Sequence, residues 1–290
     1  MNRSCCERMN VVRNIRLIAQ MSINEMSRRK ILPILGIMTL GFFVLFDFVI
    51  GGQSSAAVPG NPLSNLATVV GDKVMAAFFV NLFIGFMAIF IVSGAITPEV
   101  DNGTLLVILA RPLKRWQIIA GKWLAVLVMQ VVMIPILVIV TSIIVHAYFP
   151  HQSIPLPALM GTILSFLEEG WILSLLALLG SVFLSQVANG IMIGLAFIIN
   201  FIVGSMAQLV HHSLILQIVS PTLSLLMPTN ELYRRALFEW SGGISNPFLL
   251  SALGPFGVTH PPAGSIAIYA IIYTGIIFAI TCRSFARLDV

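Results

Sequence analysis

The sequence predicts an all-α fold, that of a polytopic membrane protein with six transmembrane helices. Apolar residues make up 58% of the 290 residues and charged residues only 9%, whereas soluble globular chains have about 45–50% and about 25%. Six stretches are each apolar over about the 20 residues that a helix needs to cross a bilayer. Because these stretches are continuously apolar rather than alternating, helices are expected in place of barrel strands.

The same composition excludes several other classes of protein. So few charges cannot cover the surface of a water-soluble domain, and so apolar a chain is not disordered. Three cysteines, Cys5, Cys6 and Cys282, are too few for a disulfide-rich secreted scaffold. The net charge of +5 comes from Lys and Arg beside apolar stretches, so the bilayer rather than a nucleic acid is the expected partner.

The expected helices follow the order of the apolar stretches. Residues 1–30 have apolar positions at helical spacings with arginines between them, which predicts a cytoplasmic amphipathic helix in the membrane interface, with a partly ordered basic tail as the alternative. Residues 31–290 are expected to form one six-helix membrane domain. A polar break from Ser185 to Gly190 separates the fourth span from the fifth. The predicted spans are 31–50, 75–97, 123–145, 164–184, 188–208 and 264–282.

The long connection between the fifth and sixth spans is too apolar for a solvated loop. Its segments 211–216 and 231–238 are typical of short helices that lie in the interface or re-enter the membrane. Short helices on the outer side of the membrane are therefore expected in this connection.

The basic residues predict the orientation. Of the 16 Lys and Arg residues, 13 lie before the first span, in or beside the connection 98–122, or after the last span. Only Lys73, Arg234 and Arg235 lie on the other side. Because positive residues are retained in the cytoplasm, both chain ends and the connection are expected there. Two ends on one side also require an even number of spans, which six provides.

The connection between the second and third spans carries the most information. Asp101, Asn102 or Thr104 can cap a short helix, and the apolar residues that follow would form one or two turns. Arg111-Pro112 ends this helix, because proline cannot donate the next hydrogen bond. An apolar helix on the cytoplasmic side needs a protein partner or lies against lipid, and the local pattern leaves both alternatives open.

The connection carries Glu99 and Gly103-Thr104-Leu105, then Leu109, Arg111-Pro112 and Arg115, and finally Gly121-Lys122. This order of residues resembles that of permease subunits in the ABC type-2 exporter family, such as those of multidrug and antibiotic export and of copper-enzyme maturation. The basic end of the chain, from Arg283 to Asp289, is similar to the tail of these permeases. The resemblance implies a cytoplasmic coupling helix between spans two and three that contacts a separate ATPase subunit. The residues that it assigns to ATPase coupling are Glu99, Gly103, Thr104, Leu105, Leu106, Leu109, Arg111, Pro112, Arg115 and Lys122.

The resemblance implies a non-catalytic permease that exports an unidentified substrate from a prokaryotic cell, in whose inner (plasma) membrane it lies. It also implies assembly with an ATP-binding cassette ATPase and with a second permease, either an identical copy or a close paralogue. ATP and Mg would be bound by the ATPase, with no cofactor in this chain. Gly121-Lys122 is not a phosphate-binding loop, because Trp123 follows where Ser or Thr is required and Trp116 stands in place of the first glycine.

Two carboxylates, Glu168 and Glu169, fall in or near the fourth span. If that helix begins near Pro157 they lie near the bilayer midplane, where a carboxylate needs a cavity or a partner. If it begins near Ser165 they lie at the external interface. Adjacent helical positions point about 100° apart, so the two side chains cannot share one target. Both are candidate gate or cavity residues, and an ion-coupled secondary transporter that uses them is the alternative function.

No metal site or catalytic site is expected. His146, His151, His211, His212 and His260 all fall on the predicted outer side, but they lack the spacing of metal ligands. The pattern also contains no convergent nucleophile or Asp-rich motif, which argues against an intramembrane enzyme.

Overall fold

The computed structural model describes residues 3–28, 30–56, 62–93, 115–148, 155–210, 213–241, 256–258 and 263–287. Over these residues the secondary structure is helical, with nine helices and no strand, as the composition predicts. The helices are α1 (Arg3–Arg28), α2 (Ile31–Ala56), α3 (Pro62–Ser93), α6 (Arg115–Tyr148), α7 (Leu156–Gly180), α8 (Gln186–Leu209), α9 (Leu214–Leu226), α10 (Thr229–Trp240) and α12 (Ile266–Ala286).

Six of these helices are long and apolar enough to cross a membrane, and they correspond in order to the six predicted spans. The largest differences are at the starts of the second, third and fourth spans, and α3 begins at Pro62 rather than at residue 75. α6 already begins at Arg115, and α7 begins at Leu156, directly after Pro155, rather than at residue 164. A proline is suited to this place because the first amides of a helix have no carbonyl within the helix to donate to, so its lack of an N–H costs no hydrogen bond.

The break between α7 and α8 lies earlier than the sequence predicts. α7 ends at Gly180, whose carbonyl accepts hydrogen bonds from the amides of Phe183 and Leu184, and α8 already begins at Gln186. The polar residues assigned to the break instead form the first turns of α8. The Asn189 side chain turns inward, where its Nδ2 donates to the Ala177 carbonyl at 2.8 Å, so a buried hydrogen bond explains its polarity.

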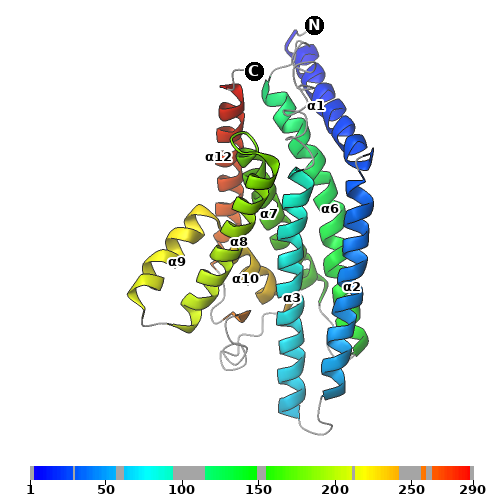
Figure 1. Ribbon diagram of the computed structural model, residues 1–290, viewed down its shortest axis with the longest axis vertical. Helices are drawn as coiled ribbons and strands as arrows, with labels where there is room; N and C mark the ends of the chain where they lie inside the picture. Colours follow the sequence, from blue (N-terminus) through cyan, green and yellow to red (C-terminus); the bar gives the residue numbers. More distant parts are fainter. Residues whose placement is uncertain are drawn as a thin grey trace.

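α7 is the central helix of the bundle. It contacts α3, α6, α10 and α12, and its buried residues extend over almost its whole length. α2, α8, α9 and α12 lie at the periphery, and both ends of the chain lie at the same end of the bundle (Figure 1). A central helix with neighbours on all sides positions every polar side chain that it carries inside the protein.

α1 is a regular helix over residues 3–28, and its place in the membrane interface stays a prediction. It lies along the first part of α6 (Figure 1) and turns Ala19, Ser22 and Met26 into the contact. The opposite face is exposed and carries Val12 and Met21 among polar residues. The helix is thus amphipathic, and part of its apolar face is covered by protein.

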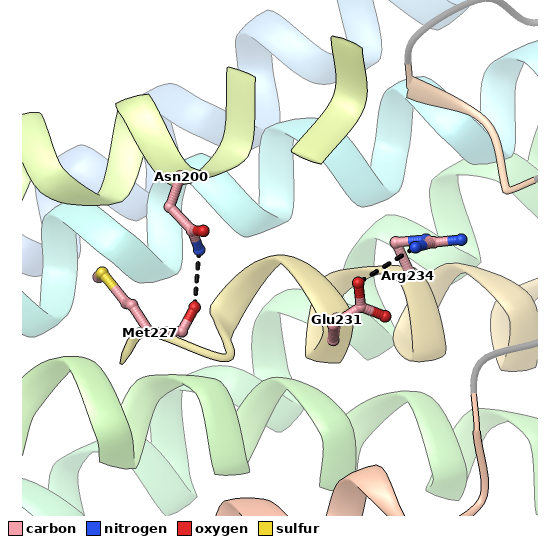
Figure 2. A network of polar contacts seen from close by, with 4 residues as sticks. All are labelled: Asn200, Met227, Glu231 and Arg234. Atoms are coloured by element: carbon pink, nitrogen blue, oxygen red, sulfur yellow. Dashed lines mark hydrogen bonds and ion pairs between the residues drawn. The ribbon is translucent and has the colours of Figure 1, made fainter. Parts of the chain in front are cut away.

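The expected short helices between the fifth and sixth spans are present as α9 and α10 (Figure 1). α9 packs beside α8 and buries no residue, whereas α10 is inserted between α7, α3 and α8. The Asn200 Nδ2 of α8 fixes the turn between them by donating to the Met227 carbonyl at 2.8 Å (Figure 2). It also donates to Thr229 Oγ1 at 2.9 Å. α10 is therefore held at its N-terminal end and lies inside the bundle.

Candidate functional site

The end of the bundle that carries both chain ends brings three helices together. α6 begins there at Arg115, whose Nη1 donates to the carbonyl of Ala286 at the end of α12 at 3.2 Å. A guanidinium at the C-terminus of a helix satisfies a free carbonyl and interacts favourably with the helix dipole. Arg115 was assigned to ATPase coupling, and the structure gives it a role in joining α6 to α12.

The contact between α1 and α6 depends on Gly121. A methyl group added at this glycine would lie 2.7 Å from the Ile18 Cβ and 3.0 Å from the Ile15 carbonyl oxygen of α1. Both distances are shorter than ordinary van der Waals contact, so a residue without a side chain is required for this approach. The next residue, Lys122, is almost wholly buried at 2% exposure, which places this second coupling candidate inside the bundle.

The other predicted coupling residues lie outside the residues that the structure describes. They are Glu99, Gly103, Thr104, Leu105, Leu106, Leu109, Arg111 and Pro112. The described helices on either side, α3 and α6, end and begin at Ser93 and Arg115. The coupling helix therefore stays a prediction, and the structure describes only the helices before and after this segment.

Glu169 lies in the middle of the bundle. α7 begins at Leu156, so the carboxylate is roughly 20 Å along a helix that rises 1.5 Å per residue. This favours the first of the two predicted depths. Glu169 is fully buried and faces α3, where the Asn81 amide, oriented to donate, is 2.6 Å from Oε1 and 3.1 Å from Oε2.

Glu168 points to a different neighbour. Its Oε2 lies 4.0 Å from Nη1 of Arg235 on α10. Part of its surface lines a cavity of about 290 Å³ with the side chains of Trp123 and Trp171. The two adjacent carboxylates thus face separate targets on α10 and α3, as their angular separation on a helix requires.

α10, which carries Arg235, is deeply buried in the bundle. Tyr233, Leu237 and Trp240 are at most 1% exposed, and the Trp240 ring meets Phe166 of α7 edge to face at 6.4 Å. The Tyr233 hydroxyl donates to the Phe256 carbonyl at 3.0 Å. Burial, and to a lesser degree the charge of Glu169, raises the pKa of this phenol, so it remains a donor.

The chain matches a known protein family over almost its whole length, from within α1 onward. Residues 9–290 match the ABC-2 family transporter proteins. The chain belongs to the ABC-2 transporter family. No curated protein matches it. The family resemblance predicted from the coupling segment is therefore confirmed over nearly the full length, including the described bundle.

Membership of the ABC-2 family makes the chain a permease, that is, an integral multi-pass membrane component of an ABC transporter. Permeases of this family are typically non-catalytic subunits that work with an ABC ATPase. Within the described part of this permease, no three His, Cys, Asp or Glu side chains come close enough together to bind a metal ion. Of the five histidines considered as metal ligands, only His146 lies among the described residues.

The sequence pattern identified Glu168 and Glu169 but not the residues that they contact. Asn81 is one polar residue in an apolar stretch, and Arg235 belongs to a segment that the pattern assigned only to a short helix. The pairing could be found only from the packing of α3 and α10 on α7. The sequence contains one usable signal: a carboxylate at this depth requires a partner, although the pattern does not say which residue it is.

Proposed function

We propose that this permease exports its substrate by alternating access, driven by ATP that a separate ATP-binding cassette subunit hydrolyses. ATP and Mg are bound by that subunit, and two permeases, identical or closely related, form the pathway. The chain lies in a prokaryotic inner membrane with both ends in the cytoplasm, because most of its Lys and Arg residues gather at that end.

The observation that carries the proposal is the convergence of α1, the start of α6 and the end of α12 at one end of the bundle. The segment with the family's coupling pattern begins at Glu99 and its last residues, Arg115 and Lys122, belong to α6. A force on that segment would act on α6, and through the Gly121 contact on α1. α6 in turn packs on α7, the helix that bears both buried carboxylates.

At the far side of α7, α10 acts in this proposal as the outer gate. Its contacts with α7 include the Arg235–Glu168 pair and the Trp240–Phe166 contact. A shift of α7 would change both contacts. A differential free energy of a few kcal/mol between two arrangements is enough to exchange their populations.

The experiment tests the coupling segment. The permease is coexpressed with an ATP-binding cassette subunit from a neighbouring reading frame, and copurification and ATP hydrolysis are measured in detergent. Leu105→Asp with Leu106→Asp should abolish copurification and permease-dependent stimulation, because two charges cannot enter an apolar interface. The matched control is Leu105→Met with Leu106→Met, which should retain both. Normal coupling of the charged variant would overturn the proposal, as would ATP hydrolysis by the purified permease alone.

A second candidate function, ion-coupled secondary transport, is favoured by one observation, the full burial of Glu169 in the middle of a span. It predicts proton uptake into liposomes that contain the permease alone under an imposed pH gradient. The ATP-driven proposal predicts no such uptake. Uptake that Glu169→Gln abolishes would establish the second function in its place.

A further inference from the structure

A cavity of about 570 Å³ lies between the end of α9, α10 and the start of α12. It is separate from the Asn81–Glu169 and Arg235–Glu168 contacts of the candidate site. Beside the cavity α12 is joined to α9 by the Tyr269 hydroxyl, which donates to the Leu225 carbonyl at 2.6 Å. A space of this size is within the range of small-molecule sites.

Two opposite charges line this cavity side by side. Glu231 and Arg234 lie one turn apart on α10, with the Arg234 Nη1 3.1 Å from the Glu231 Oε1 (Figure 2). The Arg234 Nε also donates to the Gln208 side-chain oxygen of α8 at 3.2 Å, once that amide is oriented to satisfy its neighbours. The side chain of Arg234 is only 16% exposed and that of Glu231 only 26%. These contacts hold the guanidinium in place and use two of its five donors.

The rest of the lining is amphiphilic. Three serines, Ser220, Ser224 and Ser265, contribute hydroxyl groups, whereas Leu225 and Ile266 contribute apolar wall. α9 continues this apolar wall to the surface, since it buries none of its residues and exposes Ile218 and Leu226. A ligand with a polar head and an apolar tail would match both parts of this surface.

We propose that the cavity binds a zwitterionic phosphate–ammonium headgroup, with Arg234 binding the phosphate, Glu231 the ammonium and the serines the remaining phosphate oxygens. An anionic headgroup meets the Glu231 carboxylate, and a purely cationic one meets the guanidinium, so neither is favoured over a headgroup that carries both charges. The headgroup belongs to a bilayer lipid or to a soluble molecule of the same chemistry. The site does not depend on the direction of transport.

The test uses the full-length permease in vesicles that contain equal amounts of phosphatidylethanolamine and phosphatidylglycerol. After extraction in mild detergent, native mass spectrometry counts the lipids that stay bound. Wild-type protein should retain phosphatidylethanolamine in preference to phosphatidylglycerol. Arg234→Gln should lower that preference about tenfold, which corresponds to about 1.4 kcal/mol. Glu231→Gln should shift retention toward phosphatidylglycerol, because it removes the repulsion of the anion.

Two further variants keep the test decisive. Ser224→Phe, on the weakly packed α9, fills the cavity without touching either charge and should lower retention even if Arg234→Gln unfolds. Gly36→Ala on α2 adds a methyl group with nothing within 4 Å and should leave retention unchanged. Displacement of the lipid by free phosphoethanolamine would assign the site to the soluble headgroup, and failure to displace it to the lipid. Equal retention of both lipids by wild type, or unchanged retention in Ser224→Phe, would overturn the proposal.

Discussion

Asn81 of α3 and Glu169 of α7 meet at the centre of the helix bundle, where both side chains are fully buried. The oriented Asn81 amide approaches both carboxylate oxygens, at 2.6 and 3.1 Å. Protein surrounds both side chains, so each partner depends on the other for its hydrogen bonds. The pair therefore fixes the rotation of α3 against α7.

The first prediction concerns this pair. Asn81→Leu should destabilise the protein by about 1–3 kcal/mol, because it leaves a buried acceptor without its donor. The double variant Asn81→Leu with Glu169→Leu should recover much of this loss, since neither polar group then remains. Unfolding in detergent, followed by circular dichroism, gives the free energies of wild type, of the single variants Asn81→Leu and Glu169→Leu, and of the double variant. A double variant whose loss equals the sum of the two single losses would show that the residues are not coupled.

The second prediction concerns the contact of α1 with α6. Gly121→Ala should displace α1, because the added methyl group would lie 2.7 Å from the Ile18 Cβ. The displacement can be measured as a longer and broader spin–spin distance between labels on Met21→Cys and Leu124→Cys, both exposed positions, in a background without the native cysteines. The control is Gly36→Ala, since nothing lies within 4 Å of a methyl group there. An unchanged distance in Gly121→Ala would refute the close contact.

The six spans could be predicted from composition because bilayer thickness sets both the length and the apolarity of a helix. Which side of each helix faces protein could not be predicted. Lipid is as apolar as the side chains of a helix interface, so the hydrophobic pattern around α6 or α7 does not separate the two environments. The sequence therefore predicted Glu169 as a candidate gate or cavity residue, but it did not predict that Asn81 is its partner.

Helix ends were predicted less well for a related reason. Asn189 reads as part of a polar break, yet its side chain bonds the Ala177 carbonyl inside the protein. Polarity in the sequence reports that a group needs hydrogen bonds and does not say whether water or backbone supplies them.

The third prediction tests the α7–α8 turn. Gly180→Ala should destabilise the protein by about 1–3 kcal/mol, because its methyl group would overlap the Asn189 side chain and displace that buried hydrogen bond. Gly194→Ala on α8 is the matched control, since the nearest atom to its methyl group is the Ile89 Cδ1 at an ordinary 3.6 Å. Thermal unfolding in detergent compares the two. Equal midpoints would mean that α8 does not approach Gly180 as described.

The fourth prediction follows from the burial of Tyr233 in α10. Its folded pKa is raised above the ordinary tyrosine value of about 10. The unfolded chain therefore ionises this phenol first as pH rises, so the stability that it contributes is complete below about pH 10 and is lost above it. Unfolding free energies measured from pH 8 to 11 should fall more steeply for wild type than for Tyr233→Phe. The difference between the two curves isolates this residue from the other titrating groups. Parallel curves would show that the phenol is accessible to solvent, and α10 would then not be the buried helix on which the proposed outer gate depends.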